Sequence, residues 1–116
     1  MHLSGGGIVG KFGEDILFPM EYSAVLDSLY DPPQIMYDCM RWSGMSQREA
    51  YRTWNGGQGF LLVVRPSQAA TLLALAQEAE VPAKVVGRIL KESQPRLVIH
   101  SRFGGGIIEY FPEQKD

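Results

Sequence analysis

Two short stretches of this chain place glycines beside hydrogen-bonding side chains, a combination suited to binding phosphate or another anion. They are residues 2–7 (HLSGGG) and residues 51–59 (YRTWNGGQG). Glycine lets the backbone take positive φ and approach a ligand closely. A helix that begins after the first stretch would direct free N–H groups at an anion, a dipole contribution of about 0.3–1 kcal/mol. The plainer alternatives are a flexible leader for the first stretch and a tight turn for the second.

The second stretch leads into the apolar run of residues 60–64 (FLLVV). This run lacks alternation with polar residues, which predicts a strand covered on both faces and central to a sheet. Arg52, Thr53 and Asn55 come just before it. We therefore expect three hydrogen-bonding side chains at the entrance to a buried strand.

The elements that position these stretches follow from local patterns. Ile8, Phe12 and Ile16 recur at four-residue spacing, which predicts a helix from Ile8 to about Phe18. Residues 22–27 form a short β-like segment. Ser46 with Glu49 three residues later is a capping box, and it opens a short helix that delivers Arg52 to the glycine loop.

A further helix is expected to open at Asp31 as N-cap with Pro32 at its first position, and to end at Ser43-Gly44. Its apolar face is expected to be core rather than a cofactor site. That face comprises Ile35, Met36, Cys39, Met40 and Trp42. Cys39 is the single cysteine, which excludes an internal disulfide and favours a reducing compartment.

The clearest helical pattern follows Arg65 and places four apolar residues on one core-facing side, ending near Glu80 because Pro82 disfavours helix at Val81. Those four residues are Ala69, Leu72, Leu73 and Ala76. Residues 84–90 read as a strand, which Gly87 weakens unless something packs closely against it. Residues 96–100 are expected to return as an antiparallel strand, and residues 103–110 to add an edge strand.

Composition sets the class of protein. The chain has 116 residues, 45% hydrophobic and 21% charged, which fits one globular domain spanning residues 1–116. Its net charge of −2 and lack of a basic run argue against nucleic acid and anionic membranes as partners. It contains no apolar run of transmembrane length and no secretory signal pattern, so a cytoplasmic location is expected.

The glycine-bearing stretches carry a resemblance to one enzyme family. Residues 2–7 resemble the "HITGGG" signature of the aminoimidazole ribonucleotide synthetase (phosphoribosylformylglycinamidine cyclo-ligase) family, with Ser4 in place of threonine. Residues 51–59 resemble that family's "YRTFN-x-G-x-G", with Trp54 and Gly56 as departures, and residues 86–89 (VGRI) resemble its "I-G-x-V" strand. Selenophosphate synthetase and formylglycinamidine ribonucleotide amidotransferase belong to the same superfamily, which leaves a paralogue as an alternative.

The resemblance implies the C-terminal, substrate-side domain of that synthetase. The implied fold is α+β, a mixed or antiparallel sheet of about four strands with helices packed on it in a three-layer arrangement. The implied phosphate-binding residues are Ser4, Gly5, Gly6 and Gly7. The implied substrate groove comprises His2, Arg52, Thr53, Asn55, Gly57 and Gly59.

The family's reaction is an ATP-dependent ring closure on a phosphorylated ribonucleotide, and the resemblance implies ATP and Mg²⁺ in the complete enzyme. The family holds them on an N-terminal domain with a "D-G-x-G-T-K" type segment, which this sequence does not contain. We therefore expect no metal site, no bound cofactor and no catalysis in this chain alone. The implied partners are an ATP-binding domain in cis or in trans and further copies in a homo-oligomer. The alternative is a stand-alone module that binds a phosphometabolite or a partner protein.

Overall fold

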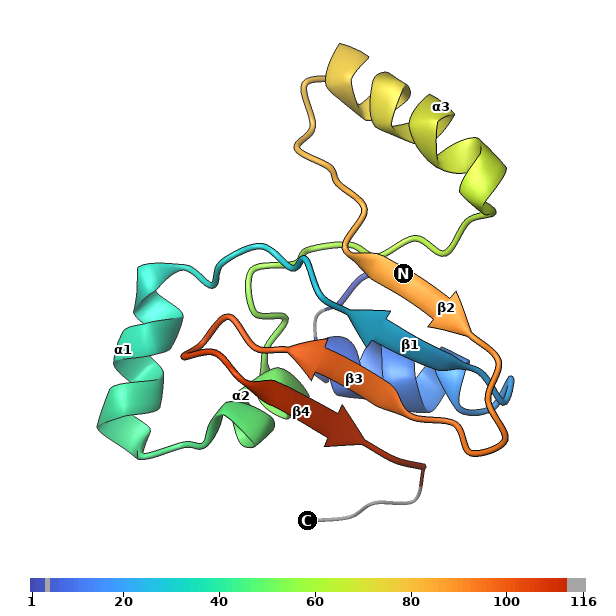
Figure 1. Cartoon of the computed structure of the whole chain (residues 1–116). Helices are drawn as coiled ribbons and strands as arrows, with labels where there is room; N and C mark the ends of the chain where they lie inside the picture. Colours follow the sequence, from blue (N-terminus) through green and yellow to red (C-terminus); the bar gives the residue numbers. More distant parts are fainter. Residues whose placement is uncertain (4, 113–116) are drawn as a thin grey trace.

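The computed structural model describes residues 1–3 and 5–112 (Figure 1). Within these residues it contains four helices and one open, mixed sheet of four strands in the order β2-β1-β3-β4. The helices are η1 (Ile8–Leu17), α1 (Gln34–Ser43), α2 (Gln47–Thr53) and α3 (Pro66–Glu78). The strands are β1 (Ser23–Leu26), β2 (Gly87–Leu90), β3 (Leu97–His100) and β4 (Ile107–Tyr110). The predicted α+β class is confirmed.

The sheet is centred on β1 and β3, which run parallel, and each has an antiparallel neighbour on its outer side. β4 is the predicted edge strand. β2 is shorter than the predicted strand of residues 84–90. β3 was expected to return beside it, but β1 lies between them. The glycine in β2 has the close contact that its position requires: a Cβ on Gly87 would stand 2.0 Å from the Val25 carbonyl oxygen.

The core lies between one face of this sheet and the helices η1 and α2, which sit behind the strands in Figure 1. Alternate strand residues point into it, because successive side chains of a strand face opposite sides. They include Ala24, Leu26, Leu97, Ile99 and Tyr110. The helices contribute Ile8, Val9, Phe12, Leu17, Ala50 and Tyr51.

The first helix is confirmed over the predicted range, but it is wound as a π-helix. Its i→i−5 bonding is visible at its end, where the Phe18 N–H donates to the Gly13 carbonyl at 2.9 Å. The wider turn points Phe12, Gly13 and Leu17 inward. Ile16, expected on the buried face, is therefore only partly buried.

The start of α1 differs from the prediction, because the helix begins at Gln34 with Pro33 as its N-cap. A residue before proline favours extended backbone, so Pro32 cannot open the helix ahead of Pro33. Asp31 binds Arg102 instead of capping. The helix ends as predicted, at Gly44 with φ 73°. Its apolar face is less buried than expected, because Ile35 and Trp42 are exposed and the other three residues are partly buried.

The capping box that opens α2 is confirmed in its main feature. The Ser46 hydroxyl accepts from the Glu49 N–H at 3.2 Å. The helix runs through Arg52 to Thr53 and buries Ala50 and Tyr51. The capping box that predicted this helix is a local pattern, and the structure confirms it.

Two predictions about the middle of the chain are wrong. Residues 60–64 are not a central strand: only Phe60 forms a β-bridge, with His2, and Leu62 is 66% exposed. β1 and β3 have no free edge for this run, because β2 and β4 already pair with them.

The α3 helix forms with its four apolar residues on one side, but it buries none of them. Figure 1 shows α3 standing apart from the sheet on two extended segments. No helix among the described residues is long and apolar enough to cross a membrane.

Candidate functional site

The two glycine-bearing stretches, far apart in sequence, meet in the structure. Gly5, Gly6 and Gly7 all have positive φ, at 72°, 140° and 61°. Gly7 packs against the end of α2 so tightly that a Cβ would stand 2.3 Å from the Trp54 carbonyl oxygen and 2.8 Å from that of Tyr51. The glycine loop of residues 5–7 therefore has its backbone fixed by the α2 end. Ser4, the fourth predicted phosphate ligand, lies outside the described residues.

Loop 55–59 follows Trp54 and holds itself in shape through its own side chains. The Asn55 Oδ1 accepts from the Gly57 N–H at 2.8 Å, so this predicted groove residue shapes the turn. Gly57 packs on the backbone of Asp31, where a Cβ would stand 2.7 Å from the carbonyl oxygen. The predicted site residues Asn55 and Gly57 thus define the position of the loop.

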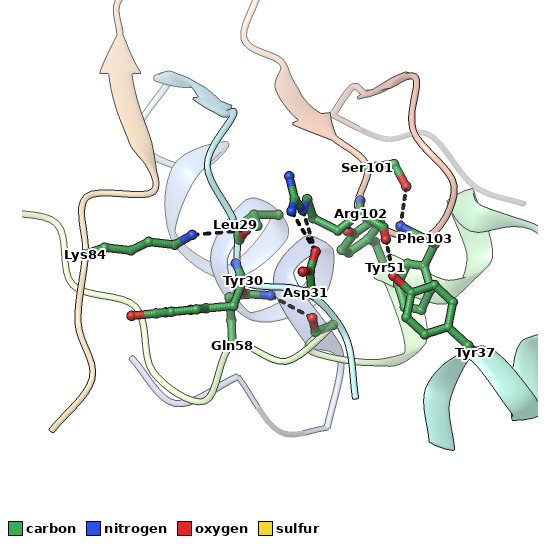
Figure 2. Close-up of polar contacts among 11 residues, drawn as sticks. Leu29, Tyr30, Asp31, Tyr37, Tyr51, Gln58, Lys84, Ser101, Arg102 and Phe103 are labelled. Atoms are coloured by element: carbon green, nitrogen blue, oxygen red, sulfur yellow. Dashed lines mark hydrogen bonds and ion pairs between the residues drawn. The ribbon is translucent and has the colours of Figure 1, made fainter. Parts of the chain in front are cut away.

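Gln58 is the buried side chain on which loop 55–59 closes, and sequence reasoning did not single it out. Its Nε2 donates to the carbonyls of Asn55, at 3.1 Å, and Gly56, at 2.9 Å. Its Oε1 accepts from the Tyr30 N–H, which ties the loop to the segment after β1 (Figure 2). A glutamine between two glycines has no sequence pattern that would predict a buried side chain holding a loop together.

The remaining predicted groove residues lie around this loop in different ways. His2 is exposed, with its ring 5.9 Å from that of Phe60, and the Leu3 N–H donates to the Gly59 carbonyl at 3.2 Å. The structure therefore brings His2 close to Gly59. Arg52 is directed elsewhere, with its guanidinium 5.3 Å from the Tyr110 ring and 3.9 Å from the Glu14 carboxylate. Thr53 is exposed at the end of α2.

Lys11, in the helix η1, lies beside the glycine loop, and sequence reasoning missed it. Its Cε lies 4.0 Å from the point where a Cβ on Gly5 would stand, so the lysine stem runs beside the loop. Its backbone N lies 3.8 Å from the corresponding point on Gly6. An ammonium group near a helix N-terminus adds a positive charge to the backbone dipole. The available signal was a lysine one turn into a helix that follows three glycines.

A second group of polar residues, whose contacts Figure 2 shows, includes Asp31, Tyr37 and Arg102, which line an open cavity of about 300 Å³. Arg102 binds the Asp31 carboxylate through Nε at 2.8 Å and through its NH2 nitrogen at 2.7 Å. The Arg102 N–H donates to the Tyr51 hydroxyl at 2.9 Å, and the Tyr37 hydroxyl donates to the Arg102 carbonyl. Burial raises the pKa of the Tyr51 phenol above its ordinary value of 10.0. These residues are distant in sequence, so no local pattern predicted their meeting.

The described residues do not fit a magnesium site. Among them there is no group of three or more histidine, cysteine, aspartate or glutamate side chains placed to hold a metal ion. Glu14 and Asp15 are exposed on η1, as a surface pair. Phosphoryl transfer needs carboxylates that hold Mg²⁺, so no such step can be assigned to this part of the chain.

The fold and the site define a small α+β domain in which a glycine loop opens a helix and packs against the end of a second helix. Residues 1–100 match the family of the AIR synthase related protein, C-terminal domain. The chain belongs to this family, as the resemblance of its two glycine-bearing stretches implied.

Curated relatives carry the name phosphoribosylformylglycinamidine cyclo-ligase. The protein from Magnetococcus marinus is 33% identical over 104 residues, which cover 85% of this chain and 28% of the relative. The protein from Staphylococcus carnosus is 31% identical over 101 residues, covering 84% and 28%. The protein from Methanocaldococcus jannaschii is 31% identical over 65 residues, covering 56% and 19%. The matched region thus spans less than a third of the length of each relative.

Proposed function

We propose that this chain is the substrate-side domain of an ATP-dependent cyclo-ligase of purine biosynthesis, which converts formylglycinamidine ribonucleotide to aminoimidazole ribonucleotide. In that role it binds the phosphorylated ribonucleotide and presents it for ring closure, in the cytoplasm and as part of a homo-oligomer. The family and its cyclo-ligase relatives support this proposal. The cyclo-ligase activity is that of the complete relatives, and it is assigned to this chain only as a component of this proposal.

The observation that carries the proposal is the packing of Gly7 on the Trp54 carbonyl. It fixes the backbone of the glycine loop, and a preorganised loop loses less entropy on binding than a flexible one. The loop opens η1, so the helix dipole favours an anion there, and Lys11 adds a full positive charge beside it. A ribonucleotide phosphate is the anion that the proposed substrate supplies.

We assign ATP and Mg²⁺ to a separate ATP-binding domain. The lack of a metal-binding group among the carboxylates of the described residues supports this assignment. What this chain supplies is the phosphate loop with His2, Thr53 and loop 55–59 near it, whereas Arg52 is directed toward Tyr110 and Glu14. Alone it binds the substrate and does not close the ring.

Isothermal titration with ribose 5-phosphate tests the phosphate loop. We expect weak binding by the natural chain and none by Gly6→Val, since valine at φ 140° cannot keep the loop conformation. Lys11→Met keeps the stem and removes the charge, and it should weaken binding about tenfold, as loss of a charge-assisted hydrogen bond does. Lys91→Met, an exposed lysine beside Tyr22, is the matched control. Unchanged affinity in both Gly6→Val and Lys11→Met would show that the phosphate binds elsewhere.

A further inference from the structure

The open cavity of about 300 Å³ that Asp31 helps to line has no role in the function proposed above. Ligand pockets have volumes of about 300–1,000 Å³, so this cavity suits one functional group of a ligand rather than a whole nucleotide. Five of its lining residues, Ser101 to Gly105, come after residue 100, where the match to the family ends. The cavity is therefore built largely from residues outside the matched region.

The lining of the cavity combines a charged pair with aromatic rings and a glycine. Asp31 and Arg102 supply the charged pair, and Figure 2 shows the guanidinium directed at the carboxylate. The rings of Tyr37 and Phe103 meet edge to face, with their centroids 5.6 Å apart. Gly105 has a φ of 87°, and no atom of the described residues stands within 4 Å of its Cβ position. A small planar group can therefore enter between the charged pair and the glycine.

The geometry of the ion pair decides which ligand charge the cavity favours. Arg102 binds through Nε at 2.8 Å and through its NH2 nitrogen at 2.7 Å, and both contacts are to Oδ1 of Asp31. A carboxylate has about four lone-pair sites on its two oxygens, so Oδ2 can accept hydrogen bonds from a ligand. The Asp31 side chain is 68% exposed, which leaves it accessible to a ligand. The pair thus presents an acidic acceptor.

A planar cation with N–H donors matches this acceptor. An amidinium group has the shape and charge of a guanidinium, and it can donate charge-assisted hydrogen bonds to a carboxylate. Its flat face can lie against an aromatic ring, as that of a guanidinium does. An anion would instead be repelled by Asp31, and it would have to compete with that carboxylate for Arg102. The cavity therefore favours an amidine over a carboxylate or a phosphate.

We infer that the cavity is an amidine subsite, in which Asp31 accepts hydrogen bonds from the amidinium nitrogens and Arg102 holds the carboxylate in position. Asp31 is the recognition residue, and Arg102 is a positioning residue. The contacts and charges of these two residues carry the inference independently of the phosphate loop.

The subsite is close enough to the phosphate loop for one molecule to occupy both. A Cβ on Gly57 would stand 2.7 Å from the Asp31 carbonyl oxygen, and Trp54 contacts the glycine loop at Gly7. The three residues of chain from Trp54 to Gly57 span at most about 10 Å. Formylglycinamidine ribonucleotide carries an amidine and a phosphate on different carbons of its ribose. Its amidine is the group assigned to the subsite, and this assignment rests on the function proposed above.

NMR of the backbone amides of the full chain, titrated with three small probes, tests the subsite by itself. Acetamidine, acetamide and acetate have nearly the same size and differ in charge. We expect acetamidine to shift the amides of residues 101–105 and to bind about tenfold more tightly than acetamide, because a charged donor makes the stronger hydrogen bond. Asp31→Asn should remove this preference. Asp38→Asn is the matched control, since Asp38 is also paired with an arginine, Arg41, at 3.0 Å, and it should leave the preference unchanged.

Isothermal titration with formylglycinamidine ribonucleotide and with ribose 5-phosphate tests the assignment to the substrate. We expect the ribonucleotide to bind more tightly than ribose 5-phosphate, and Asp31→Asn should reduce the ratio of the two affinities about tenfold. Asp38→Asn should leave that ratio unchanged. If ribose 5-phosphate does not bind the natural chain, the phosphate loop of the proposed function is wrong, and the acetamidine titration still decides the subsite.

Three results would overturn the inference. The first is that acetamidine shifts none of the amides of residues 101–105, or shifts them equally in the natural chain and in Asp31→Asn. The second is that acetate binds there more tightly than acetamidine, since the cavity would then be an anion site. The third concerns the substrate: if acetamidine binds in the cavity but the ribonucleotide binds no more tightly than ribose 5-phosphate, the amidine of the ribonucleotide is not the occupant.

Discussion

Gly7 and the carbonyl oxygen of Trp54 are in contact across two elements, with 2.3 Å between that oxygen and the point where a Cβ on Gly7 would stand. Only glycine fits at this position, and its φ of 61° independently favours glycine. The contact leaves no space for a side chain between the glycine loop and the end of α2. A larger residue at position 7 must therefore displace the backbone of one of them.

Gly7→Ala is predicted to destabilise the protein by about 2–4 kcal/mol, because the methyl group overlaps two carbonyls and alanine disfavours positive φ. Gly10→Ala is the matched control, since Gly10 lies in the helix η1 that follows Gly7 and nothing stands within 4 Å of its Cβ position. The control should be neutral or stabilising by up to about 1 kcal/mol. Urea unfolding followed by circular dichroism measures both. Equal stability of the two variants would contradict the contact.

Gln58→Glu is predicted to destabilise the protein by about 2–4 kcal/mol at neutral pH. The introduced carboxylate cannot donate to the carbonyls of Asn55 and Gly56, and it faces both of them. A buried carboxyl in this position has a raised pKa, so the variant should regain stability relative to the natural chain as the pH falls toward 4–5, roughly. Chemical denaturation at several pH values measures this recovery.

The control for Gln58→Glu is Gln68→Glu, the same change in the first turn of α3, where the side chain is exposed. A surface change of this kind should fall within about 0.5 kcal/mol of the natural chain. If the Gln58 variant is equally mild at neutral pH, then the three hydrogen bonds of Gln58 do not hold loop 55–59.

Elements with local signals could be predicted from the sequence. The Ser46–Glu49 cap, the glycine that ends α1 and the edge strand at Ile107–Tyr110 each depend on residues within a few positions of one another. Local hydrogen bonding and turn geometry decide such features, so the chain need not be folded to reveal them.

Elements whose state depends on distant partners could not be predicted in the same way. The apolar run of residues 60–64 suits a buried strand, but pattern alone does not say which strand edge is open to it. Asp31 suits a helix cap, but Arg102, 71 positions later, takes its carboxylate. The α3 pattern correctly located one apolar side, and it could not say what covers that side.

The residues of the candidate site also differ in whether a local sequence pattern could predict them. The two glycine-bearing stretches were recognisable as sequence motifs, and their meeting at Gly7 and Trp54 agrees with a shared role. Lys11 had a weak local signal in its position one turn after the glycines. The cluster of Asp31, Tyr51 and Arg102 had none, since it assembles from three separate segments.

Tyr51 is predicted to make stability fall at alkaline pH. Burial raises the pKa of its phenol above 10.0, so the folded state holds a proton that the unfolded state releases first. This contribution is fully present below the unfolded pKa and is lost as the pH rises through the folded pKa. Tyr51→Phe should lower stability by about 1 kcal/mol at neutral pH, because the Arg102 N–H loses its acceptor. The variant should also lose stability less steeply above about pH 10. Urea unfolding at stepped pH compares the slopes, and identical slopes would exclude Tyr51 as the cause.

Glu80→Gly is predicted to stabilise the end of α3 by about 1 kcal/mol, since Glu80 occupies a left-handed position that glycine adopts without strain. Its φ is 57°. The Glu80 N–H donates to the Gln77 carbonyl at 3.1 Å and the Val81 N–H to the Ala76 carbonyl at 2.9 Å, which is the Schellman pattern of a helix end. Glu78→Gly, inside the helix, should have the opposite sign and cost up to about 1 kcal/mol. Hydrogen exchange of the α3 amides, measured in dilute protein, resolves the two. We expect the α3 amides to exchange more slowly in Glu80→Gly and faster in Glu78→Gly. If both variants change the exchange rate in the same direction, the backbone strain at Glu80 does not determine the stability of the helix end.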